Sequence, residues 1–244
     1  MSNDLHLWIT RPAMDGERMA VQVREQGLTP WQMPAMDIFW LMPDKVGLRA
    51  ITHANVVIVT SRHALTSLEK ANIVLPTTAI WFAIGQATAA ALAARGIEAT
   101  VPTQTDSEGL LHEMFEKITS GQQLVILKGE GGRTLLAERL QARGLSVTEV
   151  PLYRRICKSF DAGMVDTFLK QERRALSVAS AETLTCVLKG LTQVQAKLLV
   201  DLPLVVMSER VAQFAQAKGW RGEIVVADES SSAGLINAAK QVRF

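Results

Sequence analysis

The glycine-rich segment Lys128-Gly129-Glu130-Gly131-Gly132-Arg133 follows a short apolar run and precedes a helical pattern. That order is typical of phosphate-binding loops, but the segment matches neither G-x-x-x-x-G-K-[ST] nor G-x-G-x-x-G. We therefore do not expect a nucleotide site. Two interpretations remain: a tight turn in which glycine supplies a positive φ, or a loop whose backbone N–H groups face an anion beside Lys128 or Arg133.

Serine, threonine or glycine also begins most of the other predicted helices. For any single turn a helix N-cap is the better interpretation. Together they are more suggestive, because a parallel sheet gathers these turns at its carboxyl edge, where ligands bind. Hydroxyls, helix N-termini and a few arginines suit a ligand with several carboxylates. The turns are 10–12, 60–64, 84–88, 179–183, 207–210 and 227–232.

Conventional catalytic groups are scarce. The four histidines have no metal-ligand spacing, and no G-x-S-x-G, C-x-x-C or acidic pair stands out. Tyr153, the only tyrosine, is flanked by Arg154 and Arg155, and is either a packed aromatic or a proton donor. Cys157 and Cys186 are expected to be ordinary reduced thiols.

Composition excludes several classes of protein. In 244 residues, 26 Lys and Arg balance 24 Asp and Glu, too evenly for a general nucleic-acid binder. No run of about 18 apolar residues and no signal-peptide pattern is seen, so we expect a cytoplasmic protein that binds neither membrane nor nucleic acid.

Short apolar runs alternate with helical patterns, which predicts parallel sheets covered by helices. Several helices stop at a glycine suited to a left-handed cap. The expected helices include 87–95, 134–143 and 210–218, with caps at Gly96, Gly144 and Gly219. The expected strands are 5–10, 56–60, 80–84, 123–128, 176–179, 204–207 and 222–227.

A weak internal repeat organises these elements. Residues 83–96 align with 206–219, 56–65 with 175–184, and 20–34 with 137–151. Two similar domains, or chance likeness between α/β units, would explain it. The first interpretation inserts a domain of residues 41–149 into another made of 1–33 and 157–244. Segments 34–40 and 150–156 would then form a linker ladder, with a ligand cleft between the domains.

Several segments of the chain resemble the uroporphyrinogen-III synthase family, and the resemblance runs over nearly the whole chain. The segments are "LKGEGGRTLLAERLQARGLSVTEVPLYRR", "TRP", "VTSRHAL" and "AIGQATAAALAARG". The resemblance implies two flavodoxin-like α/β domains with parallel sheets, joined by a two-stranded antiparallel linker. It implies a cyclising hydro-lyase of tetrapyrrole (heme) biosynthesis that converts hydroxymethylbilane to uroporphyrinogen III with inversion of the terminal ring. No metal or cofactor is implied, and a monomer is expected.

The resemblance also implies site residues. Tyr153 matches a tyrosine proposed to assist departure of the substrate hydroxyl. Ser208 is assigned with Arg210 as an alternative, because the expected threonine is missing there. The remaining expected substrate-binding residues are Arg11, Thr60, Ser61, Arg62, Thr88, Lys128, Gly129 and Ser180. Two rival functions stay open: a two-domain binding protein for a small polyanion, and a flavodoxin-like FMN binder.

Overall fold

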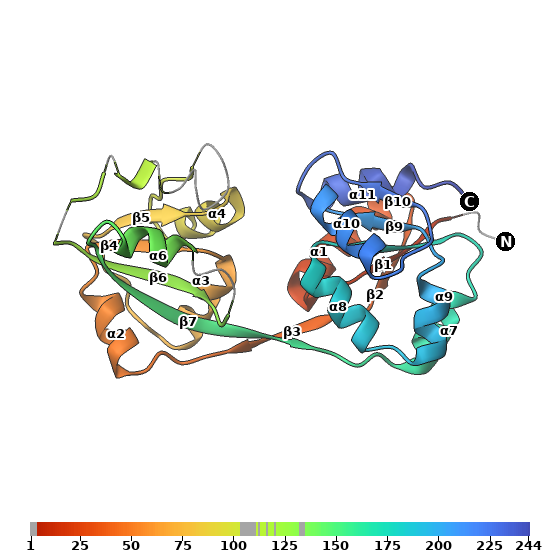
Figure 1. Ribbon diagram of the computed structural model, residues 1–244, viewed down its shortest axis with the longest axis horizontal. Helices are drawn as coiled ribbons and strands as arrows, with labels where there is room; N and C mark the ends of the chain where they lie inside the picture. Colours follow the sequence, from red (N-terminus) through yellow and green to blue (C-terminus); the bar gives the residue numbers. More distant parts are fainter. Residues whose placement is uncertain (1–3, 103–110, 112, 116, 120, 132–134) are drawn as a thin grey trace. The chain divides into compact units, whose positions relative to one another are not determined.

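The computed structural model describes residues 4–102, 111, 113–115, 117–119, 121–131 and 135–244, and divides the chain into two compact units. Unit 1 comprises Met1–Asp37 and Ile156–Phe244, and unit 2 comprises Ile38–Arg155 (Figure 1). The boundaries predicted from the sequence, and the ability of residues 41–149 to fold alone, stay predictions.

Unit 1 is built on five parallel strands in the order β10-β9-β8-β1-β2. Numbered along the chain, this is the order 2-1-3-4-5 of the flavodoxin-like fold. The strands are β1 (His6–Ile9), β2 (Thr29–Gln32), β8 (Arg174–Val178), β9 (Leu204–Val206) and β10 (Ile224–Val226).

Helices cover both faces of this sheet, because successive residues of each buried strand point to opposite sides. Trp8 and Leu176 belong to one apolar cluster, whereas Leu7 and Ala175 belong to the other. The helices are α1 (Ala13–Glu25), α7 (Ala162–Leu169), α8 (Ala181–Lys189), α9 (Gln193–Leu199), α10 (Glu209–Ala217) and α11 (Ser232–Lys240).

Unit 2 has the strand order β3-β7-β6-β4-β5. Strands β5, β4, β6 and β7 are parallel and repeat the order 2-1-3-4, while β3 takes the fifth place. The strands are β3 (Met36–Trp40), β4 (Val56–Val59), β5 (Ile80–Ala83), β6 (Gln123–Gly129) and β7 (Ser146–Cys157). The helices include α2 (Lys45–Thr52), α3 (Arg62–Lys70), α4 (Gln86–Ala93) and α6 (Leu135–Gln141).

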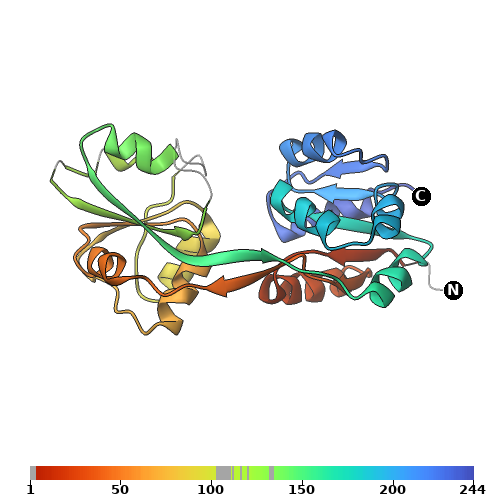
Figure 2. The same cartoon turned by 60° about the horizontal axis from the view of Figure 1, so that its bottom comes forward.

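Strand β3 runs antiparallel to β7. Leu41 N donates to Leu152 O, and Lys158 N donates to Ala35 O, so residue numbers rise on one strand as they fall on the other. Figure 2 shows β7 in green beside β3 in orange. The chain passes from one unit to the other within these two strands.

Strand β7 contains an irregularity opposite β6. Pro151 faces Lys128, but the next partner along β6, Gly129, faces Tyr153, so Leu152 is an extra residue. A bulge of this kind breaks the alternation of sides along a strand. Leu152 and Tyr153 are accordingly both buried, although they are adjacent in sequence.

The sheet orders correct the domain repeat predicted from the sequence. That repeat equates 56–65, which holds β4, with 175–184, which holds most of β8. By position in the sheet, β4 corresponds to β1, and β6 corresponds to β8. The likeness is therefore one between α/β units in general, because every such unit repeats an apolar strand, a hydroxyl turn and an amphipathic helix.

The glycine caps and the main strands were predicted correctly. Gly96, Gly144 and Gly219 have φ of +73°, +76° and +84°. The observed strands lie within a few residues of their predicted bounds, whereas β2 was not predicted. Among the described residues, every helix is too short or too polar to cross a membrane.

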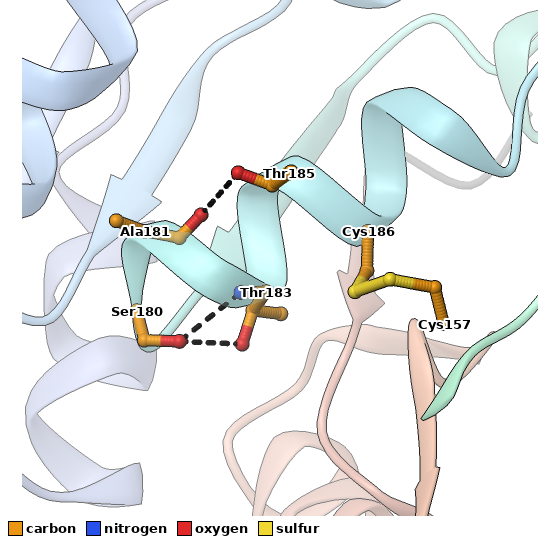
Figure 3. The surroundings of a disulfide bond; sticks show 6 residues. All are labelled: Cys157, Ser180, Ala181, Thr183, Thr185 and Cys186. Atoms are coloured by element: carbon orange, nitrogen blue, oxygen red, sulfur yellow. Dashed lines mark hydrogen bonds between the residues drawn. A yellow bond between two sulfur atoms is a disulfide. The ribbon is translucent and has the colours of Figure 1, made fainter. Parts of the chain in front are cut away.

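The expectation of two reduced thiols is wrong in this structure. Cys157, at the end of β7, and Cys186, on α8, form a disulfide with a Cα–Cα distance of 5.0 Å (Figure 3). The two residues lie 29 positions apart in sequence, and the fold of unit 1 brings their Cα atoms within bridging distance.

Candidate functional site

A pocket of about 260 Å³ lies in unit 2 where β4 and β6 end. In the flavodoxin-like order this is the switch point, from which helices leave toward opposite faces, and ligands of open α/β sheets bind there. Its lining residues are Thr60, Ile84, Ile126, Lys128, Gly129, Gly131, Leu136, Glu149, Tyr153 and Arg155. Four of the residues predicted from the sequence thus share one pocket: Thr60, Lys128, Gly129 and Tyr153.

Tyr153 reaches this pocket from the bulge of β7. Its side chain is only 2% exposed, and its ring meets that of His63 edge-on with centroids 5.5 Å apart. The hydroxyl accepts a hydrogen bond of 3.1 Å from Nη2 of Arg155, and the backbone oxygen accepts one of 2.7 Å from Glu130 N. Tyr153, which falls in the segment 150–156 predicted as a linker strand, belongs to the apolar core of unit 2, so one of the two alternatives predicted for it, a packed aromatic, describes its surroundings.

Gly129 is required by the ring of Tyr153. A Cβ at this position would lie 2.7 Å from Cζ and 3.0 Å from the hydroxyl oxygen, closer than real side chains approach. The missing side chain therefore lets the ring lie against β6. Two residues further on, Gly131 has φ +71°, which confirms a tight turn with positive φ. Gly132 and Arg133 lie outside the described residues.

Thr60 and Lys128 carry the other polar groups predicted at the pocket. The Thr60 hydroxyl donates to Leu127 O at 3.2 Å and keeps its lone pairs for a further donor. Lys128 Nζ lies 2.7 Å from Glu149 Oε1, so a neighbouring carboxylate offsets its charge. The sequence indicated Lys128 as an anion contact but did not reveal this pairing.

Ser61, Arg62 and Thr88 lie at helix starts of the same unit. The Ser61 hydroxyl caps α3 by accepting from His63 N at 3.2 Å, and Arg62 is the first residue of that helix. Thr88 is buried in the first turn of α4, where its N–H donates to Gly85 O. These three residues surround neighbouring strand ends without lining the pocket.

The other three predicted binding residues belong to unit 1, where they follow the neighbouring strands β1, β8 and β9. Arg11 Nη1 donates to the Ser232 hydroxyl at 2.8 Å. Ser180 caps α8: its oxygen accepts from Thr183 N at 3.1 Å and lies 2.8 Å from the Thr183 hydroxyl (Figure 3). Ser208 precedes α10 without a side-chain cap bond, and Arg210 is exposed on the first turn of that helix.

Arg155, Glu149 and three apolar residues of the pocket were not predicted. Arg155 lies two positions after Tyr153, and such residues point to the same side of a strand, so alternation was a usable signal. Arg154 points elsewhere: it pairs with Glu130 at 2.7 Å and lowers the pKa of that carboxyl through hydrogen bonding. Glu149 was not singled out, because nothing local marks it as a partner of Lys128.

The site combines a buried phenol, a guanidinium, an ammonium–carboxylate pair and a wall of aliphatic side chains. Across the described ranges, no group of three or more His, Cys, Asp or Glu is placed to hold a metal ion. The arrangement defines an α/β protein of two units in which a pocket of unit 2 brings together a phenol, a guanidinium and an ammonium–carboxylate pair.

Comparison with known proteins narrows this class. The family model described as "Uroporphyrinogen-III synthase HemD" matches residues 17–237. The uroporphyrinogen-III synthase of Salmonella typhimurium strain LT2 is 30% identical over 96% of this chain and 99% of its own length. That of Escherichia coli K12 is 28% identical with the same coverage. The chain therefore belongs to the uroporphyrinogen-III synthase family, whose members are enzymes of tetrapyrrole biosynthesis.

Two solved structures share the fold. The synthetase of Helicobacter pylori 26695 superposes with a TM-score of 0.66 at 14% identity, covering 98% of this chain and 100% of that one. A mutant synthase of Thermus thermophilus gives 0.62 at 17% identity, with 97% and 98% covered. The predicted class, a two-domain α/β fold with parallel sheets, is confirmed.

Proposed function

We propose that this protein closes hydroxymethylbilane to uroporphyrinogen III, inverting the terminal pyrrole ring and releasing water. Membership of the family supports the reaction. The structural observation that supports this pocket as the site of the reaction is the position of the Tyr153 hydroxyl. The hydroxyl is buried at the pocket and accepts a hydrogen bond from Arg155. A phenol held in this way can hydrogen-bond to a departing hydroxyl.

The first step is the departure of the substrate hydroxyl, and Tyr153 alone serves as its acid. The bond between the terminal methylene carbon and its hydroxyl breaks, and the electron pair leaves with the oxygen. The phenol proton completes a water molecule. The nitrogen of the pyrrole ring that carries this methylene supplies electrons to the methylene carbon and loses its own proton. The phenolate of Tyr153 takes up that proton and becomes a phenol again. The resulting azafulvene is then attacked by the substituted carbon of the last ring.

The remaining task is to select the carbon that attacks. Hydroxymethylbilane closes spontaneously to isomer I, so the protein must favour the competing closure. A difference of about 1.4 kcal/mol between two transition states already gives tenfold selectivity. Positioning of a flexible substrate supplies several kcal/mol. No strong acid or base is needed, which agrees with the modest set of groups at the pocket.

Binding of the substrate carboxylates is proposed for residues of both units. In unit 2 these are Thr60, Ser61, Arg62, Thr88, Lys128 and the backbone at Gly129. In unit 1 they are Arg11, Ser180 and Ser208. Helix starts bind anions through free N–H groups, and arginine binds carboxylates through paired donors. We further propose a cytoplasmic monomer that needs no cofactor.

The test is an assay of product isomers. The purified protein is mixed with freshly prepared hydroxymethylbilane, the products are oxidised to porphyrins, and isomers I and III are separated. We expect isomer III to predominate, and a heat-denatured sample to give isomer I at the spontaneous rate. Isomer I alone from the native protein would contradict the proposal. A binding protein for a small polyanion would protect the bilane without forming isomer III, and an FMN binder would purify yellow.

A further inference from the structure

The phenol of Tyr153 has one proton and an oxygen that also accepts. A guanidinium has five N–H donors and no acceptor. In the bond of 3.1 Å between them, Arg155 Nη2 must therefore donate and the Tyr153 oxygen must accept. The proton of the phenol is not used in this bond, and it stays available to a second acceptor.

The second acceptor can be a ligand, because the hydroxyl is fixed at a pocket wall. Gly129 lies against the ring on one side, since a Cβ there would come within 2.7 Å of Cζ. His63 packs against the ring edge-on. Both Tyr153 and Arg155 line the pocket of about 260 Å³.

Arg155 holds the phenol in a second way. Its guanidinium carbon lies 5.3 Å from the centroid of the Tyr153 ring, within the range of a cation–π contact. The two residues are two positions apart on β7 and share one side of the strand. The same cation thus touches the face of the ring and the oxygen of the phenol.

From these contacts we propose that Arg155 is a positioning residue. By donating to the Tyr153 oxygen, Arg155 prevents the phenol from donating its own proton to the side chain at position 155, and so directs the phenol proton to the substrate. This inference rests on the proposed function. A glutamine at position 155 offers an acceptor oxygen as well as donors, so it can capture the proton that arginine leaves available.

A double-mutant cycle separates this role from direct binding of substrate. The variants are Arg155→Gln, Tyr153→Phe and the pair. We expect Arg155→Gln to lower kcat about tenfold or more, the scale of one hydrogen bond to a charged group, with KM within about threefold of the unchanged protein. In the Tyr153→Phe background the same change should lower kcat by less than about twofold.

Arg155→Lys and Arg154→Gln complete the design. Lysine keeps a charged donor without an acceptor, so Arg155→Lys should recover part of the activity lost in Arg155→Gln. Arg154 is the matched control, because its side chain is 48% exposed and paired with Glu130; its change should leave kcat and isomer ratio unaltered. Circular dichroism and thermal midpoints establish that each variant is folded.

Equal losses from Arg155→Gln in the Tyr153 and Tyr153→Phe backgrounds would overturn the inference, and a rise in KM would assign Arg155 to substrate binding instead. If the glutamine variant does not fold, Arg155→Lys decides: a loss of kcat that is the same in both backgrounds contradicts the inference. If the protein without substitutions forms no isomer III, the proposed function itself is contradicted, whatever the variants do.

Discussion

The two units place a threonine in the same way at equivalent strands. In unit 1 the Thr10 hydroxyl, after β1, donates to Ser177 O on β8 at 2.7 Å. In unit 2 the Thr60 hydroxyl, after β4, donates to Leu127 O on β6 at 3.2 Å. Both bonds join the first and third parallel strands at the switch point of the sheet.

The units differ in what the fourth strand adds. In unit 1 the fourth strand, β9, has three residues. In unit 2 it is β7, with twelve residues and a bulge that places Tyr153 at the pocket. Shared topology thus provides similar polar turns, and the group able to transfer a proton comes from an extension of one strand. We therefore expect substitutions in unit 2 to affect chemistry and those in unit 1 to affect binding and stability.

The largest expected effect is that of Tyr153→Phe. Removing one positioned proton donor should lower the rate about 10²–10⁴-fold, while isomer III still forms above background. Ser180→Ala in unit 1 should lower it less than about tenfold, because only one positioning contact is lost. Rates and isomer ratios of both folded variants check this. Comparable losses would remove the distinction between the units, and isomer I alone would show that catalysis depends on a single group.

The next effect concerns the disulfide of unit 1. Closing a loop of 29 residues should stabilise the fold by about 2–4 kcal/mol. Reduction, or Cys186→Ser, should lower the free energy of unfolding by that amount in urea titrations. Thiol counting before and after reduction is the control. Free thiols in the protein as isolated would show that the bridge is not formed under those conditions.

Gly129→Ala should disturb unit 2 more modestly. The new Cβ overlaps the Tyr153 ring, and overpacking of this kind costs about 1–3 kcal/mol. Because the ring must move, the rate should fall together with stability. Gly85→Ala is the comparison variant: a Cβ there meets nothing within 4 Å, and the change costs only the preference of a helix N-cap for glycine over alanine. Equal behaviour of the two variants would show that the ring is free to shift without loss.

The smallest effects are those of the capping serines. Ser61→Ala and Ser180→Ala each remove a hydrogen bond to a helix N–H and should cost about 1 kcal/mol of stability. Ser208→Ala should cost less, because its side chain makes no cap bond. Thermal unfolding measures all three. A loss of substrate affinity without loss of stability at Ser208 would favour its proposed contact with a carboxylate.

Local patterns predicted much of the fold. Gly96, Gly144 and Gly219 were placed correctly because a left-handed helix cap depends on neighbouring residues alone. The short edge strand β2 was harder to predict. It contains Pro30, which weakens a strand pattern, yet it pairs with β1. The disulfide could not be read, since the approach of Cys157 to Cys186 depends on how β7 and α8 meet.

Some of the residues that line the pocket of unit 2 were also singled out by local patterns. Thr60 follows β4, whereas Lys128 and Gly129 are the last two residues of β6, and a parallel sheet gathers such strand ends at one edge. The side of β7 from which Tyr153 and Arg155 act depends on the bulge at Leu152, which no short pattern specifies. The pairing of Lys128 with Glu149 depends on the register of β6 against β7.

The split of unit 1 around unit 2 has a consequence for synthesis on the ribosome. Thr10 and its partner Ser177 are separated by 167 residues, so β1 is made long before β8 exists. Translation adds about 5–20 residues per second, so β8 is made roughly 10–30 seconds after β1. During that time the apolar side chains of β1 and α1 lack the neighbouring strand that buries them in the folded unit. All of unit 2 is translated in that interval. We expect the nascent amino-terminal segment to depend on chaperones until residue 178 has left the exit tunnel.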